Sequence, residues 1–124
     1  MGKRSREKGK RGERQLAAAL REYGYHARRG VQYQGGKDSP DVTGLPGIHI
    51  EVKYTERLSL YDALAQAKRD SGGGELPAVF HRRNNCGWVT VMALEDWMEL
   101  YRLWELYHEQ EDKSAPQAGN AGRH

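Results

Sequence analysis

Residues 39–53 of the chain read SPDVTGLPGIHIEVK. This segment is predicted to form a β-hairpin, because Pro46-Gly47 is a typical chain reversal and the residues after it alternate between apolar and polar. The alternation assigns side chains to two faces of the second strand, with Ile48, Ile50 and Val52 on one and His49, Glu51 and Lys53 on the other. We expect the first face to meet a core and the second to carry chemistry.

The length of the turn decides whether the hairpin brings its carboxylates together. With Pro46-Gly47 alone as the turn, Asp41 would lie on the opposite face from Glu51, since a slip of one residue turns a strand over. With Leu45 added to the turn and a left-handed conformation at the glycine, Asp41 lies opposite Glu51, roughly 5 Å away between Cβ atoms. We expect this longer turn, or a bulge, because a divalent cation between the carboxylates removes a repulsion that would raise a pKa.

The composition fits one domain with a modest core. The chain has 124 residues, of which 37% are hydrophobic, and most of these fall in its middle. A single cysteine, Cys86, excludes an internal disulfide and a multi-cysteine zinc site, and fits a reducing interior. No segment has the length and apolarity of a membrane span or a signal peptide, so we expect a cytoplasmic protein with no membrane partner.

The net charge of +3 conceals an asymmetry between the two ends of the chain. Residues 1–14 carry seven basic and two acidic side chains, whereas residues 95–112 carry seven acidic side chains and one arginine. Further basic side chains stand in the middle of the chain, namely Arg28, Arg29, Lys37, Arg82 and Arg83. The pattern favours a polyanionic partner, most simply nucleic acid, although the basic arm alone also fits a solubilising tail.

The periodicity predicts the element order α-β-β-β-α-β-β-α, a mixed α/β (α+β) fold in which helices flank a central sheet of about five strands. Helices are predicted over about 12–23, 59–70 and 94–108, and strands over about 25–34, the two arms of the hairpin, 77–81 and 88–92. We expect a disordered basic arm at 1–10, a single domain at 11–108 and a disordered tail at 109–124.

The first predicted helix carries a carboxylate on its apolar side. Its apolar stripe consists of Leu16, Ala19, Leu20 and Tyr23. Glu13 lies on the same stripe, and an ionised carboxylate that faces a core is costly unless something pairs with it. Glu13 is therefore a site candidate, and the alternative is a hydrated acid that the helix dipole favours in the first turn.

The last predicted helix is rich in aromatic residues, namely Trp97, Tyr101, Trp104 and Tyr107. This is more apolar surface than a small core needs, so the helix is expected to cover the sheet or to supply a dimer contact.

Glu13, Asp41, Glu51 and Lys53 form the candidate site. Carboxylate oxygens are hard ligands that suit Mg²⁺ or Mn²⁺ rather than zinc, and such an ion can polarise a phosphodiester. Lys53 is a donor that can stabilise charge on the phosphorane or position the attacking water. His49 shares the register of this face and is interpreted as a hydrogen-bonding neighbour rather than a ligand.

These motifs resemble the PD-(D/E)XK nuclease superfamily, and within it the Holliday-junction-resolvase-type endonucleases of archaea and phages. The resemblance runs from about Gly9 to Tyr101. It rests on Gly12-Glu13-Arg14-Gln15-Leu16, a glycine-rich loop before Pro40-Asp41, Glu51-Val52-Lys53, Gln66-Ala67, Pro77-Ala78-Val79 and Trp88-Val89.

The resemblance implies a restriction-endonuclease-like core and a homodimeric, Mg²⁺- or Mn²⁺-dependent endodeoxyribonuclease, structure-specific and prokaryotic or phage-encoded. It assigns catalysis to Glu13, Asp41, Glu51, Lys53 and Gln66, with Asp41, Glu51 and Glu13 as metal ligands. DNA binding is assigned to Arg28, Arg29, Lys37, Ser39, Lys10 and Arg11, with Arg29 preferred over Arg28. Gln66 also fits a solvated helix residue.

Two alternatives stay open at this point. The same fold can serve a nicking, restriction or repair nuclease, or a non-catalytic nucleic-acid-binding module. Because Glu13, Asp41, Glu51 and Lys53 are all present, the module is disfavoured, since a degenerate nuclease is expected to lose one of them.

Overall fold

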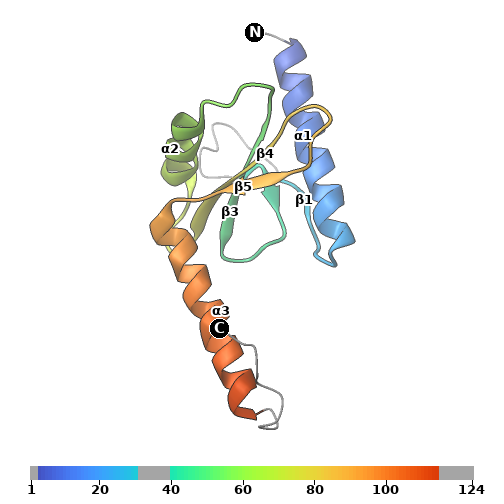
Figure 1. Cartoon of the computed structure of the whole chain (residues 1–124). Helices are drawn as coiled ribbons and strands as arrows, with labels where there is room; N and C mark the ends of the chain where they lie inside the picture. The colour runs from blue at the N-terminus through green and yellow to red at the C-terminus, as the bar shows by residue number, and fades with distance from the viewer. Residues whose placement is uncertain (1–2, 31–39, 115–124) are drawn as a thin grey trace. The chain divides into compact units, whose positions relative to one another are not determined.

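The fold is that of a computed structural model that describes residues 3–30 and 40–114. Its elements are α1 (Lys3–Glu22), β1 (Arg28–Arg29), β2 (Val42–Thr43), β3 (Ile48–Tyr54), α2 (Leu60–Asp70), β4 (Leu76–Arg82), β5 (Val89–Val91) and α3 (Leu94–Ser114) (Figure 1). The predicted order of helices and strands is confirmed. The chain divides into two compact units, residues 1–93 and 94–124, and the candidate site lies wholly in the first.

Within the described residues, five strands form one mixed sheet in the order β1-β2-β3-β4-β5. The strands β3 and β4 are parallel, and all other neighbours are antiparallel. A parallel pair needs a long crossover connection, and α2 supplies it between β3 and β4. The central position of β3 places the polar face of the hairpin in the middle of the sheet.

The register of the hairpin is the one that the longer turn predicts. Val42 pairs with Ile50, which is the pairing that the longer turn predicts, and Asp41 stands directly before Val42. The backbone N–H of Asp41 donates to the Ile50 carbonyl at 3.0 Å, although Ile50 is the partner of Val42, so the chain departs from the regular ladder at Asp41 as it does in a bulge. Gly47 has a φ of +92°, the left-handed conformation that the turn requires.

Figure 1 shows α1 and α2 on opposite sides of the sheet, and each helix contributes to its own apolar cluster. The α1 side buries Leu16, Ala17, Ala27, Val42, Ile50, Val52, Ala78 and Phe80. The α2 side buries Ala63, Ala67 and Val79. The alternation in β3 is confirmed, since Ile50 and Val52 belong to the α1 cluster while their polar neighbours face the other way.

The helix α1 differs from the prediction at both ends. It begins at Lys3, so it takes in most of the segment assigned to a disordered arm. Lysine, arginine and glutamate are good helix formers, and Lys8 and Arg11 also lie over the ring of Tyr54, 4.9 and 5.9 Å from its centroid. Tyr23 is 80% exposed, so its place on the apolar stripe is wrong; it follows the last helical residue, where helical periodicity no longer applies.

Other boundaries differ as well. The strand predicted over 25–34 is confined to Arg28–Arg29, and residues 31–39 lie outside the described part of the chain. The last helix runs to Ser114, beyond the predicted end at 108, and a contact of 3.6 Å between His108 and Glu111 supports its final turns. Both expectations for α3, sheet cover or dimer contact, stay predictions. No helix among the described residues has the length and apolarity to cross a membrane.

Candidate active site

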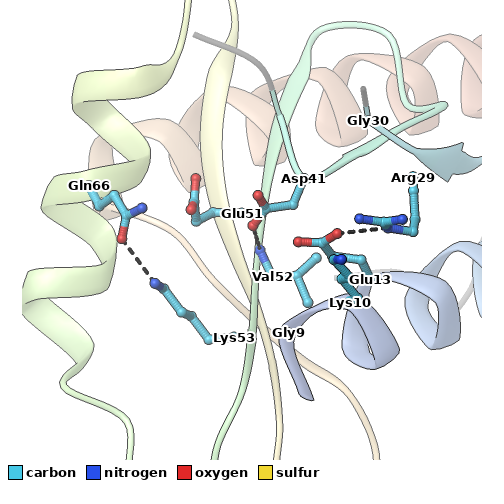
Figure 2. Close-up of a pocket in the computed structure, with 10 residues that line it drawn as sticks. All are labelled: Gly9, Lys10, Glu13, Arg29, Gly30, Asp41, Glu51, Val52, Lys53 and Gln66. Atoms are coloured by element: carbon cyan, nitrogen blue, oxygen red, sulfur yellow. Dashed lines mark hydrogen bonds and ion pairs between the residues drawn. The ribbon is translucent and has the colours of Figure 1, made fainter. Parts of the chain in front are cut away.

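A pocket of about 560 Å³ opens over the polar face of β3. It is lined by residues of α1, β1, β3 and α2, by the residue after β1 and by the segment before β2 (Figure 2), namely Gly9, Lys10, Glu13, Arg29, Gly30, Asp41, Glu51, Val52, Lys53 and Gln66. All five residues that the sequence assigned to catalysis therefore lie in one pocket.

The hairpin fixes the two central carboxylates. Asp41 accepts a hydrogen bond of 2.8 Å from the backbone N–H of Val52, while Glu51 is only 4% exposed. Burial and the neighbouring charge of Asp41 raise the pKa of Glu51 to about 8. Burial also raises the pKa of Asp41, an effect that the Val52 hydrogen bond partly offsets and the charge of Glu13 adds to. In the absence of a cation, this pair therefore tends to hold a proton.

These donors fit a hard divalent cation. Two opposed, poorly hydrated carboxylates lose their mutual repulsion when a cation lies between them. Mg²⁺ is commonly held by one or two carboxylates, with water and substrate phosphate completing its coordination. Among the described residues, no three histidine, cysteine, aspartate or glutamate side chains converge as a complete cage. The site therefore fits an ion that Asp41 and Glu51 hold while an open side remains for substrate.

Glu13 lies at the edge of the pocket and is paired with Arg29. The Arg29 Nε donates to the Glu13 carboxylate at 2.9 Å, and the two side chains are 38% and 19% exposed. The pair joins α1 to β1 across the pocket, as Figure 2 shows. Arg29 therefore combines a fixed position with access to solvent, which suits a phosphate contact.

Lys53 and Gln66 join β3 to α2 on the other side of the pocket. The Lys53 ammonium donates to the Gln66 side-chain oxygen at 2.9 Å (Figure 2). Since Lys53 stands one pleat beyond Glu51, its ammonium is held on the same face as the carboxylates. Gln66 thus lies in the pocket rather than on a solvated helix face, and its catalytic role stays a prediction.

The predicted DNA-binding residues fall in different places. Lys10 and Arg29 line the pocket, whereas Arg11 lies over the Tyr54 ring and Arg28 is exposed on β1 outside the pocket lining. Lys37 and Ser39 lie outside the described residues.

Gly30 contributes to the site through its backbone, which the sequence pattern did not reveal. Its N–H donates to the Asp41 carbonyl at 2.8 Å. A Cβ atom on this residue would lie 2.1 Å from the Pro40 carbonyl oxygen, so only glycine allows β1 to pass so close to the segment that carries Asp41. No local signal marks this role, because it depends on a neighbour ten residues away.

Comparisons with known proteins concern the family and the fold of the chain. Residues 4–69 match the sequence profile of the family described as archaeal Holliday junction resolvase (Hjc). Among solved structures, the fold is similar to Hjc of the archaeal hyperthermophile Archaeoglobus fulgidus, a Holliday junction resolvase, with a TM-score of 0.51 and 26% sequence identity. This similarity covers 68% of the present chain and 72% of the other. A search of curated proteins gives no significant match.

Proposed function

Since the chain belongs to the archaeal Holliday junction resolvase family, we propose that the pocket in Figure 2 is the centre at which it cuts DNA. The protein is a structure-specific DNA endonuclease of a family whose members are generally dependent on divalent metal. One observation carries the proposal for the site: Asp41 and Glu51 are neighbours in one pocket, and Lys53 follows one pleat later on the strand that carries Glu51 (Figure 2).

Asp41 and Glu51 are proposed to hold Mg²⁺ or Mn²⁺. A bound ion of this kind supplies polarisation of the phosphodiester and charge neutralisation at the leaving oxygen. The Val52 N–H keeps Asp41 turned toward the pocket, and Gly30 holds the backbone of the same residue. Glu13, which is bound to Arg29, is proposed to act at the edge of the site rather than as a third close ligand.

Lys53 is proposed to stabilise the negative charge that grows on the phosphoryl oxygens during hydrolysis. Its ammonium is held by Gln66 at 2.9 Å, so it is oriented before DNA arrives. A preoriented donor is most effective where charge develops, because no reorganisation is needed at the moment of reaction. Gln66 is proposed to position Lys53 and has no direct part in bond breaking.

Lys10 and Arg29 are proposed to bind the DNA backbone beside the scissile phosphate. Both line the pocket, and Arg29 is fixed by Glu13.

A homodimer is proposed as the working form, because two symmetric cuts in a four-way junction need two sites. The proposed location is the inside of a prokaryotic cell, where DNA is available. Sedimentation of the protein alone and with a junction tests the stoichiometry.

The decisive experiment compares cleavage of a four-way junction, a flap and a linear duplex built from the same arm sequences. Single-turnover reactions use saturating protein with Mg²⁺, with Mn²⁺ and with EDTA. Glu51→Gln is the variant at the site, and Glu22→Gln, on the exposed end of α1, is its matched control. The proposal predicts metal-dependent cutting of the junction that Glu51→Gln abolishes and Glu22→Gln retains.

The outcomes separate the alternatives. Equal cutting of all three DNAs would point to a nicking, restriction or repair type of nuclease. Binding of the junction without cutting under any metal would overturn the catalytic role of the pocket. If Glu51→Gln cut DNA at the parent rate, the catalytic site would lie elsewhere on the molecule.

A further inference from the structure

His49 is a fully buried polar residue next to the site, and the proposed mechanism gives it no task. None of its surface is exposed, and it stands two residues before Glu51 on the same face of β3. Neither ring nitrogen has a hydrogen-bond partner among the described residues. Burial of a polar group without a hydrogen-bond partner costs free energy. The polar groups that face this ring therefore indicate what it does.

Carboxylates face the ring on both of its nitrogens. Nε2 lies 3.5 Å from Oε1 of Glu51, and Nδ1 lies 3.8 Å from Oε1 of Glu75. Glu75 comes from the segment between α2 and β4, and the same oxygen accepts the Gly72 N–H at 3.1 Å. Glu75 is thereby fixed in place while its side chain is 40% exposed. A row of three polar side chains thus leads from the surface to the central carboxylate of the pocket.

We propose that His49 is a positioning residue that holds Glu51 in the orientation needed to bind the cation. The inference rests on the proposed function, in which Glu51 is a ligand. His49 does not line the pocket, so it acts through Glu51 and does not itself contact the cation.

The geometry explains how one ring can serve this purpose. A neutral imidazole donates from one nitrogen, and the tautomer with a proton on Nε2 points its N–H at Glu51. The 3.5 Å separation is a few tenths of an ångström too long for a normal hydrogen bond, and such contacts commonly tighten when the site is loaded. One Glu51 oxygen is then engaged by the ring, which leaves the other for the cation. Removing a partner of this kind typically weakens metal binding about 10–100-fold.

The test compares His49→Leu, which removes the donor, with His49→Gln, which keeps one. Three quantities are measured: Mn²⁺ affinity without DNA by electron paramagnetic resonance, thermal unfolding in EDTA, and junction cleavage under single turnover. His49→Leu is expected to unfold cooperatively and to bind Mn²⁺ about 10–100-fold more weakly, with cleavage restored at high Mn²⁺. His49→Gln is expected to recover most of the affinity, which a purely space-filling role would not predict.

The parent protein and Glu51→Gln distinguish a failure of the proposed function from a failure of the inference about His49. If the parent binds no Mn²⁺, or if Glu51→Gln binds it as tightly as the parent, the proposed function fails and the inference fails with it. If those two behave as expected and His49→Leu binds Mn²⁺ within about twofold of the parent, only the inference is wrong.

His49→Phe decides the question if His49→Leu does not fold. Phenylalanine keeps a planar ring at this buried site and removes both ring nitrogens. A loss of Mn²⁺ affinity of about tenfold or more supports the inference, provided that Glu22→Leu, an exposed control, binds as the parent does. Parent-like affinity in His49→Phe overturns it.

Discussion

Asp41 and Glu51 are neighbours in one pocket, and the backbone N–H of Val52 donates to the Asp41 carboxylate at 2.8 Å. The relationship makes the two carboxylates a single cation-binding unit. Asp41→Asn and Glu51→Gln are each expected to lower the single-turnover cleavage rate at least about 100-fold, because the ion loses a charged ligand. In EDTA near neutral pH, Glu51→Gln is expected to raise the melting temperature, since folding no longer has to bind a proton at a buried carboxyl whose free pKa is 4.5. A parent rate in either variant would refute the assignment.

The stability of the metal-free protein is expected to fall as the pH rises from about 5 to 8. Glu51 has a pKa of about 8 in the fold against 4.5 for the free group, so over this range the folded state keeps a proton that the unfolded state has lost. Raising the pH therefore favours unfolding. Urea unfolding in EDTA measures the slope, which Glu51→Gln should flatten and Glu22→Gln should leave unchanged. If the unfolding free energy of the parent protein stays constant or increases as the pH rises, the pKa of Glu51 is not raised.

Gly30→Ala is expected to disturb the site from a position with no functional side chain. The added methyl group would lie 2.1 Å from the Pro40 carbonyl oxygen and push away the segment that carries Asp41. Overpacking of this kind costs about 1–3 kcal/mol of unfolding free energy and should also weaken Mn²⁺ binding. Gly73→Ala is the control, because a Cβ there meets nothing within 4 Å. Equal stability of both variants would show that β1 can move aside.

The hairpin could be predicted from the sequence because its determinants are local. The alternation in β3 and the left-handed turn at Gly47 together set the pairing of Val42 with Ile50 and the face on which Glu51 lies. The start of α1 could not be predicted, since its early turns are stabilised by Tyr54, far along the chain. The same limit applies to Gly30 and to the pairing of Glu13 with Arg29, where partners meet only after the sheet has formed. The hydrophobic periodicity thus predicts which face of a helix or strand a residue occupies, whereas tertiary contacts decide where the elements end and which side chains pair.

Lys10→Gln is expected to weaken junction binding and to reduce its dependence on salt. Lys10 is exposed and lines the pocket, so each phosphate contact that it makes releases counterions. Loss of one contact should make the log–log slope of affinity against salt shallower by about 0.9. Binding is measured in Ca²⁺ by fluorescence anisotropy. Arg102→Gln, in the second compact unit, is the control, and an unchanged slope for Lys10→Gln would exclude it from the DNA interface.

Lys53→Ala is expected to separate chemistry from binding. Gln66 holds the Lys53 ammonium at 2.9 Å in the pocket, so its charge is placed for a phosphoryl group that becomes more negative during reaction. The saturated rate should fall about 10²–10³-fold while junction affinity in Ca²⁺ stays near the parent value. Lys53→Arg should not restore the rate fully, because a planar guanidinium differs in shape from an ammonium.

Gln66→Leu tests the second half of this arrangement. The ammonium of Lys53 would lose its fixed acceptor, so the rate should fall in the same direction but less than in Lys53→Ala. In the double variant, Gln66→Leu should add almost nothing to Lys53→Ala, since both substitutions remove one interaction. Lys68→Ala, on the exposed side of the same helix, should behave as the parent. If Lys53→Ala instead abolished junction binding and left the saturated rate intact, Lys53 would be a phosphate anchor. Additive losses of rate in the double variant would show that Gln66 acts independently of Lys53.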